Sequence, residues 1–222
     1  MLVKGWMTSD IITIDEDTSM MKASQIMKEN NVRRLPVMHK GKLIGMVTDR
    51  DIKEASPSKA TTLDIHELYY LLSELKIKDI MRKNLITVGP EETVEKAAVK
   101  MLEHRISGLP VVNDKGKVVG VITQGDIFKV LVSLTGIYRG GIQLAFNLED
   151  RPGSIKDVAD VIRKHGGRMV SILTSYDMCE ENCRHVYIRI KDIPEDKLKA
   201  LTEDLDKNFI LLYVVKDSLK DI

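Results

Sequence analysis

Two apolar runs separated by a short polar segment organise the middle of the chain. The runs 109–112 and 118–122 flank residues 113–116, which read Asn-Asp-Lys-Gly. Those four residues favour a tight turn, so the pattern predicts a β-hairpin. After the second run the chain passes through 123–126, Thr-Gln-Gly-Asp, into an apolar segment that is expected to form a helix.

The same pattern occurs earlier in the chain, over residues 34–52. Residues 3–53 and 77–128 align with an offset of 74, which becomes 75 after one extra residue in the second hairpin. A register kept over a whole unit predicts an internal duplication. The identical pairs include Met7/Met81, Thr13/Thr87, Ala23/Ala97, Met27/Met101, Leu35/Leu109, Pro36/Pro110, Lys-Gly-Lys at 40–42 and 115–117, Gly45/Gly120, Thr48/Thr123 and Asp51/Asp126.

Each repeat is predicted to contain a strand, a helix, two further strands and a last short helix. The β-rich runs 11–14 and 85–88 open the two repeats. One repeat of about 50 residues has too small a core to be stable alone, so the two are expected to pack together. The residues that recur at helical spacing are Met20, Ala23, Ile26 and Met27 in the first repeat, and Val94, Ala97, Ala98 and Met101 in the second.

The segment between the repeats, 55–76, is predicted to be a linker that contains a helix. Pro57 and its Ser/Thr-rich neighbours favour a loop. Asp64 followed three residues later by Glu67 forms the pattern of a capping box. An apolar stripe follows on this helix and is expected to pack on the protein itself or on a second copy. The stripe consists of Ile65, Leu68, Tyr69, Leu71, Leu72 and Leu75.

A second domain is predicted to begin after residues 134–141, where three glycines mark a boundary. The turn 149–153 joins its first strand to its first helix. The resulting order βαββαβ is that of the ferredoxin-like fold. The predicted elements are a strand at 142–148, a helix from 154 to about 166, strands at 170–175 and 186–190, a helix at 194–205 and a strand at 209–215.

Composition and charge narrow the possible partners and compartment. The chain has 222 residues, of which 43% are apolar and 30% charged, as in ordinary globular proteins. A net charge of +1 gives no electrostatic reason to expect nucleic acid or an anionic membrane as partner. No apolar run approaches the roughly 20 residues that span a bilayer, and the N-terminus lacks a secretory signal pattern. With only two cysteines, the chain is expected to be cytoplasmic.

Three short motifs occur in both repeats: Leu-Pro-Val, glycine followed by two hydrophobic residues and a threonine, and Thr-x-x-Asp. With them the duplicated unit resembles a tandem pair of CBS domains. The tail, with Asp-Arg-Pro-Gly at 150–153, resembles an ACT domain. The whole order resembles CBS–ACT regulatory proteins of the acetoin-utilisation type. The implied fold class is α/β (α+β), with two βαββα CBS units packed as a pair (1–54 and 77–134) and a ferredoxin-like βαββαβ ACT domain (141–216).

The two Thr-x-x-Asp motifs, Thr48 to Asp51 and Thr123 to Asp126, have two interpretations. In the first, each is a capping box in which threonine caps a helix and the carboxylate returns to the threonine N–H. In the second, the aspartate accepts both ribose hydroxyls while the threonine and the helix N-terminus face a phosphate. The two are geometrically compatible, and the CBS resemblance favours nucleotide binding.

The second of these sites is expected to be the better formed. Ser107 and Gly108 precede Pro110, and the glycine permits a backbone to approach a flat base closely. The proline withholds a backbone donor and fixes φ. The first repeat also has its proline, Pro36, but Arg34 stands where the second has glycine. Arg34 is therefore interpreted either as a phosphate contact of a shared nucleotide or as a solvated surface arginine.

The resemblance implies a cytoplasmic regulatory protein that binds an adenine nucleotide (AMP, ADP or ATP) in the CBS pair. Bound ligand is expected to change the angle between the repeats, and the segment 134–141 to transmit that change. No nucleophile–base pair or phosphate-binding fingerprint stands out, so neither enzymatic activity nor a catalytic cofactor is expected. A homodimer and an unknown target enzyme are the expected partners. The alternatives are S-adenosylmethionine or NAD in the CBS pair, and a ligand-independent interaction module.

The resemblance of the tail to an ACT domain implies that an amino-acid-like ligand binds at the turn that opens the tail. Its residues Asp150, Pro152, Gly153 and Ser154 precede a helix whose free N–H groups suit a carboxylate. Asp150 would then take the ammonium group. The alternative is that the turn only connects a strand to a helix and that the domain serves to dimerise.

A small group of soft ligands lies between two predicted strands of the tail. Cys179, Cys183 and His185 provide three of the four ligands that a zinc site requires. No fourth ligand is evident nearby, and a single such group without a second pair of cysteines is a weak signal. No metal is therefore expected, and these three residues are kept only as weak candidates.

Overall fold

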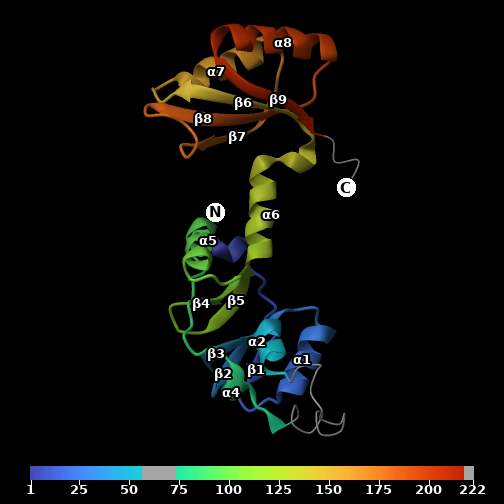
Figure 1. Cartoon of the computed structure of the whole chain (residues 1–222), viewed down its shortest axis with the longest axis vertical. Helices are drawn as coiled ribbons and strands as arrows, with labels where there is room; N and C mark the ends of the chain where they lie inside the picture. Colours follow the sequence, from blue (N-terminus) through green and yellow to red (C-terminus); the bar gives the residue numbers. More distant parts are fainter. Residues whose placement is uncertain (57–73, 218–222) are drawn as a thin grey trace. The chain divides into compact units, whose positions relative to one another are not determined.

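The computed structural model describes residues 1–56 and 74–217 (Figure 1). The chain divides into two compact units, Met1–Ile127 and Phe128–Ile222. The linker helix that the sequence predicts around Asp64 lies outside the described residues.

The first repeat contains the predicted hairpin and both predicted helices. β2 pairs antiparallel with β3 and parallel with the short β1, which gives the strand order β1-β2-β3. Ser19 caps α1 by accepting a hydrogen bond from the N–H of Lys22. The first strand covers only part of the predicted run 11–14. The elements are η1 (Val3–Gly5), β1 (Ile14–Asp15), α1 (Met20–Glu29), β2 (Arg34–His39), β3 (Lys42–Thr48) and α2 (Asp49–Ala55).

The second repeat has the same hairpin and helices, but its opening strand is reduced to a single bridge. Val88 bridges Val111 in the parallel sense, where a strand was predicted over 85–88. Thr93 caps α5 by accepting from the N–H of Lys96, as Ser19 does in the first repeat. The elements are α4 (Ile77–Ile80), α5 (Val94–Glu103), β4 (Gly108–Val112), β5 (Val118–Thr123) and α6 (Gln124–Thr135).

Equivalent positions fill the cores of the two repeats. Leu35 and Leu109, which the duplication aligns, are both fully buried. Six of the eight helix positions predicted from 3.6-residue spacing are buried as well, with Ala23 and Ala97 at 0% exposure, whereas Ile26 and Ala98 are partly buried. The hydrophobic core of the first repeat contains Ile14, Met20, Ala23, Met27, Leu35, Val37, Val47, Ile52 and Ile77.

The segment that leads into each repeat, around Thr8 in the first and around Arg82 in the second, is hydrogen-bonded to a strand of the other repeat. We call these the lead-in segments. Thr8 exchanges two backbone hydrogen bonds of 3.0 Å with Val121, and Arg82 exchanges bonds of 2.9 and 3.1 Å with Met46. Ile77, the first residue of α4, belongs to the core of the first repeat. The repeats are therefore joined through backbone as well as side chains, in agreement with the expectation that they pack as a pair.

The tail forms a four-stranded antiparallel sheet with two helices. Its element order is βαββαβ and its strand order is β7-β8-β6-β9. Figure 1 shows α7 and α8 on the same side of the sheet, where a core forms around Phe146, Ile162, Ile188 and Leu201. The elements are η2 (Ile137–Arg139), β6 (Gly141–Glu149), α7 (Ser154–Lys164), β7 (Met169–Ser175), β8 (Cys183–Ile190), α8 (Glu195–Asn208) and β9 (Ile210–Asp217).

Several predicted boundaries in the tail are displaced. α8 extends to Asn208, beyond the predicted end at 205, and Pro194 is its N-cap rather than its first residue. β8 begins at Cys183 instead of 186 because it pairs with β6 along that strand's whole length, down to Glu149. Cross-strand pairing, which local propensity does not contain, sets this limit.

Candidate functional site

The first candidate site is built where β3 ends and α2 begins. Asp51 Oδ2 accepts hydrogen bonds from Thr48 N–H (2.9 Å) and Thr48 Oγ1 (2.5 Å). The Thr48 hydroxyl in turn caps the helix by accepting from the Asp51 N–H. The capping-box interpretation of the motif is therefore confirmed for the first repeat. Although it is charged, Asp51 is only 7% exposed.

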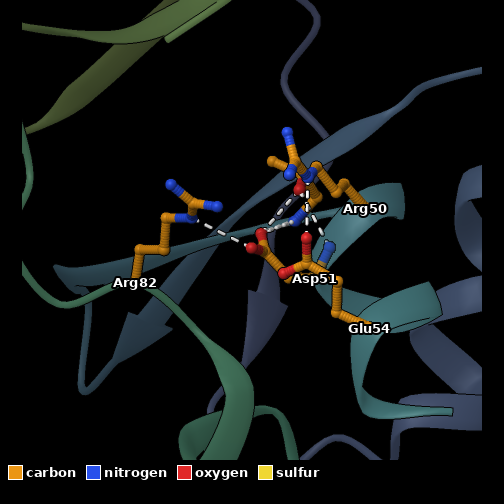
Figure 2. A network of polar contacts seen from close by, with 5 residues as sticks. Arg50, Asp51, Glu54 and Arg82 are labelled. Atoms are coloured by element: carbon orange, nitrogen blue, oxygen red, sulfur yellow. Dashed lines mark hydrogen bonds and ion pairs between the residues drawn. The ribbon is translucent and has the colours of Figure 1, made fainter. Parts of the chain in front are cut away.

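A cation from the second repeat meets this carboxylate. Nε of Arg82 lies 2.9 Å from Oδ1 of Asp51, so the two oxygens of Asp51 have different partners. Figure 2 shows Arg82 approaching from a separate segment, while Arg50 pairs with Glu54 along α2. The Arg50–Glu54 contact joins two exposed side chains one helical turn apart and belongs to the surface of the helix.

The second repeat contains the same arrangement where β5 ends and α6 begins. Asp126 Oδ2 accepts from Thr123 N–H (3.0 Å) and Thr123 Oγ1 (2.7 Å), and the Asp126 N–H donates to Thr123 Oγ1. Asp126 is 4% exposed. The duplication therefore preserves a buried carboxylate at the N-terminus of a helix in each repeat, and capping engages one oxygen of each.

Arg34 crosses from the first repeat to the second. Its Nη2 donates a 2.9 Å hydrogen bond to Ser107 Oγ, and its charge interacts with Asp126. A Cβ on Gly108 would overlap the Arg34 guanidinium, so a larger residue here would have to displace the end of that side chain. Burial lowers the pKa of Arg34 below its ordinary value, although the group stays charged. The face of Gly108 that the sequence assigned to a base is thus occupied by an arginine.

The two prolines lie within the strands that support these sites. Pro36 pairs with Met46, and Pro110 pairs with Val121. Both prolines are buried. Met46 and Val121 are the residues that bind the exchanged lead-in segments, so each proline is one strand away from a lead-in.

Arg184, which the sequence analysis did not single out, occupies the turn that opens the tail. Its Nη2 donates to Ser154 Oγ at 2.9 Å, and its Nη1 lies 3.5 Å from Asp150 Oδ1. Gly153 is the N-cap in the left-handed region (φ 90°), and Ser154 is the first residue of α7. Pro152 lies in the exposed turn itself. Asp150 therefore faces an arginine of the same domain where an ammonium group was expected.

The three weak metal candidates point to different partners. Cys179 Sγ lies 3.0 Å from the Cys183 carbonyl oxygen, whereas Cys183 Sγ faces the carbonyl oxygen of Glu181. His185 packs edge-on against Tyr187. Cys183 and His185 lie on β8 itself rather than in the connection, which is a correction of the prediction. Among the described residues, no three His, Cys, Asp or Glu side chains are grouped to hold a metal.

Arg82 is the site residue that the sequence reasoning missed. The signal was present in the duplication, because the offset of 74 aligns Arg82 with Thr8. A search for identical pairs passes over Arg82, because the aligned residue of the other repeat is not an arginine.

The fold and the paired sites define a class of protein: a duplicated α+β unit with one buried carboxylate per repeat. The sequence model of the CBS domain family matches residues 3–58 and 77–133, just over half of the chain. The chain therefore belongs to the CBS domain family and carries a tandem CBS pair. CBS pairs are in general regulatory, non-catalytic modules.

Known proteins share this pair in different settings. Homoserine O-acetyltransferase of Methanosalsum zhilinae is 38% identical over 130 residues, which are 58% of this chain and 24% of that enzyme. The chain thus spans about a quarter of the first curated relatives.

Solved structures show the same relation. The CBS domain pair of protein MJ0100, in complex with 5′-methylthioadenosine and S-adenosyl-L-methionine, has 33% identity and a TM-score of 0.50, covering 60% of this chain and 97% of that chain. A Vibrio cholerae protein described as an acetoin utilization protein (AcuB) has 26% identity and a TM-score of 0.51, covering 62% and 95%. Within residues 1–56 and 74–217, no helix is both long and apolar enough to cross a membrane.

Proposed function

We propose that this protein is a regulatory sensor whose CBS pair binds an adenine nucleotide of the AMP, ADP or ATP type. In this proposal Asp51 and Asp126 accept the ribose hydroxyls of two ligands. The other contacts come from Thr48, Arg34, Pro36, Ser107, Gly108, Pro110 and Thr123. The CBS units extend over 1–54 and 77–134, and no catalytic cofactor is involved.

The observation that carries the proposal is the burial of two equivalent carboxylates. Asp51 and Asp126 are 7% and 4% exposed, and burying a carboxylate is costly unless it is paired or hydrogen-bonded. Capping engages one oxygen of each, and at Asp51 the other oxygen accepts from a partner outside the helix, Arg82. A ribose supplies two hydroxyl donors of the kind such an acceptor binds.

S-adenosylmethionine is the second candidate ligand. It is favoured by the structure of the MJ0100 CBS pair, which is described in complex with 5′-methylthioadenosine and S-adenosyl-L-methionine. Both molecules contain an adenine–ribose unit substituted at C5′, as the adenine nucleotides and NAD do. The common chemistry is therefore the adenosine group, and the substituent at its ribose decides among the candidates.

For the tail we propose an ACT domain over 141–216 that dimerises the protein or senses an amino acid. The βαββαβ order and the polar group at the start of α7 support it. An amino-acid carboxylate would be attracted by Arg184, whose Nε is buried without a hydrogen-bond partner among the described residues. A cytoplasmic homodimer that regulates a separate enzyme completes the proposal, and a ligand-independent interaction module is the rival.

Thermal unfolding against a ligand panel tests this function. The panel contains AMP, ADP, ATP, S-adenosylmethionine, NAD and amino acids, each at a high concentration. A ligand at about 100 times its dissociation constant stabilises the folded state by about 2.7 kcal/mol, which raises Tm by several degrees. We expect an adenosine compound to raise Tm in the wild type.

Single and double variants assign the effect to the sites. We expect Asp51→Ala and Asp126→Ala each to reduce the shift and the double variant to abolish it. Glu54→Ala removes an exposed carboxylate of the same helix as Asp51 and is expected to retain the shift. Melting that no adenosine compound alters would contradict the proposal and favour the interaction module.

A further inference from the structure

The lead-in segments place different side chains beside equivalent carboxylates. Arg82 and Thr8 occupy the same position in the duplication, and each forms the same two-bond backbone bridge, to Met46 and to Val121 respectively. Since the backbones are equivalent, the position beside the first site carries a guanidinium and the matching position of the second repeat carries a neutral hydroxyl. This is a difference in charge within an otherwise conserved framework.

Arg82 uses only part of its hydrogen-bonding capacity at Asp51. Its Nε donates to Oδ1, while its two terminal nitrogens make no hydrogen bond to any residue in 1–56 or 74–217 (Figure 2). Arg82 is 55% exposed, whereas Asp51 is 7% exposed. A guanidinium has five N–H donors in a planar fork. As far as residues 1–56 and 74–217 are concerned, the terminal nitrogens of Arg82 are therefore available to an anion that approaches Asp51 from solvent.

Asp51 has little capacity left for a ligand that offers only hydroxyl groups. Its Oδ2 already accepts two hydrogen bonds from Thr48, and its Oδ1 accepts one from Arg82. Ribose hydroxyls therefore have to share Oδ1 with the guanidinium or displace it. A ligand that also carries a phosphate compensates, because it gives the displaced or shared guanidinium a second anion with suitable geometry.

We propose that Arg82 makes the first site selective for adenosine ligands that carry a phosphate. The inference rests on the proposed function and identifies the residue that decides the ligand class at one of its two sites. Thr8 leaves the second site without this source of selectivity. Arg34 also brings a positive charge near Asp126, and its side chain donates to Ser107. This contact is at the second site and does not change the role of Arg82 at the first.

The experiment compares AMP with adenosine, which differ only in the phosphate. Isothermal titration calorimetry on the full chain gives the ratio of the two dissociation constants at the first site, with Asp126→Ala present to disable the second. Asp126→Asn replaces it if the alanine variant does not fold. Arg82→Thr copies the residue of the second repeat, and Arg82→Lys keeps the charge but removes the fork. Glu54→Ala is the control on the same helix.

We expect Arg82→Thr to reduce the preference for AMP over adenosine at least tenfold, or about 1.4 kcal/mol, with adenosine binding retained. Arg82→Lys should give an intermediate preference and Glu54→Ala the unchanged one. Reciprocally, Thr8→Arg in an Asp51→Ala protein should increase the preference at the second site. An unchanged preference in Arg82→Thr would overturn this inference alone. Failure of both AMP and adenosine to bind the wild type would overturn the proposed function, and this inference with it.

Discussion

The two repeats of the CBS pair share the same backbone framework, but different side chains lie beside their buried aspartates. Thr48 and Asp51 in the first repeat make the same hydrogen bonds as Thr123 and Asp126 in the second. The arginines differ. Arg82 of the second repeat contacts the first repeat, and Arg34 of the first repeat contacts the second, at positions that the duplication does not align with each other.

This comparison separates two kinds of constraint on a duplicated unit. A capping box and a buried strand must be kept in each copy, because losing either costs folding free energy directly. A side chain that crosses to the other copy is less constrained, since its partner can change independently. The two sites of one protein can therefore diverge in ligand preference while their framework stays symmetric.

The largest expected effect tests whether the framework is equivalent. Leu35→Ala and Leu109→Ala each remove a leucine that is 0% exposed at an aligned position. We expect each to lower the free energy of unfolding by about 2–5 kcal/mol, because lost burial and a residual cavity add together. Urea denaturation measures both. Leu102→Ala, at a residue that is 73% exposed, is the control and should change stability by less than about 0.5 kcal/mol. A near-neutral result at one buried leucine would break the equivalence.

A smaller effect is expected from acid at Glu92, in the second repeat. Glu92 lies just before α5. Its carboxylate pairs with Lys96, accepts a hydrogen bond from the Gly89 N–H and pairs with Lys100. These contacts lower the pKa of Glu92 to about 2. The aligned residue of the first repeat is Thr18. Because the pKa is lowered on folding, this stabilisation is present above the unfolded pKa of 4.5 and is lost as the pH falls from about 5 to about 2.

Glu92→Gln measures that contribution. Since the Glu92 side chain is 26% exposed, solvent screening reduces the gain, and we expect about 1–2 kcal/mol. The wild type should lose this much more stability than Glu92→Gln between pH 5 and pH 2, as followed by urea denaturation at each pH. Glu103→Gln, an exposed change on the same helix, should follow the wild type. Parallel curves for wild type and Glu92→Gln would show that Glu92 does not distinguish the repeats.

The smallest effect concerns the contact between Arg34 and Gly108. Gly108→Ala displaces the end of a flexible side chain, so the cost should be below about 1 kcal/mol. In an Arg34→Ala background that cost should disappear, because nothing remains to be displaced, and the double-mutant cycle gives the coupling. Arg33→Ala, at the exposed neighbouring residue, should leave the cost of Gly108→Ala intact. Equal costs in all three backgrounds would exclude the contact in solution.

Much of the fold could be predicted because its signals are local or repeated. The hairpin around 113–116, the helix faces with Ala23 and Ala97, and both capping boxes depend on residues close in sequence. The tail's βαββαβ order follows from hydrophobic patterning in the same way. The limits of β8 and the loss of the strand at 85–88 could not be predicted, because strand pairing with distant residues decides them.

The aspartates of the candidate sites and the threonines that cap with them were predicted, whereas two arginines that contact site carboxylates were not. Asp51 and Asp126 were found because Thr-x-x-Asp is a short motif. Arg82 and Arg184 reach their partners across 31 and 30–34 residues, and no local spacing connects such pairs. Arg34 was considered, but a flat base was expected on Gly108, where the arginine itself lies. Long side chains from distant segments therefore determine the partners of an acceptor that both repeats share.

The exchange of lead-in segments means that the unit of inheritance differs from the unit of folding. The duplication copied a continuous stretch of chain, but each finished half is completed by its neighbour: Thr8 is bonded to β5 and Arg82 to β3. A gene that encoded one copy alone would leave Ile77's place in the first core empty and the edge of β3 unpaired at Met46. Descendants of this duplication are therefore bound to keep both copies in one chain, or to find the missing half in another molecule.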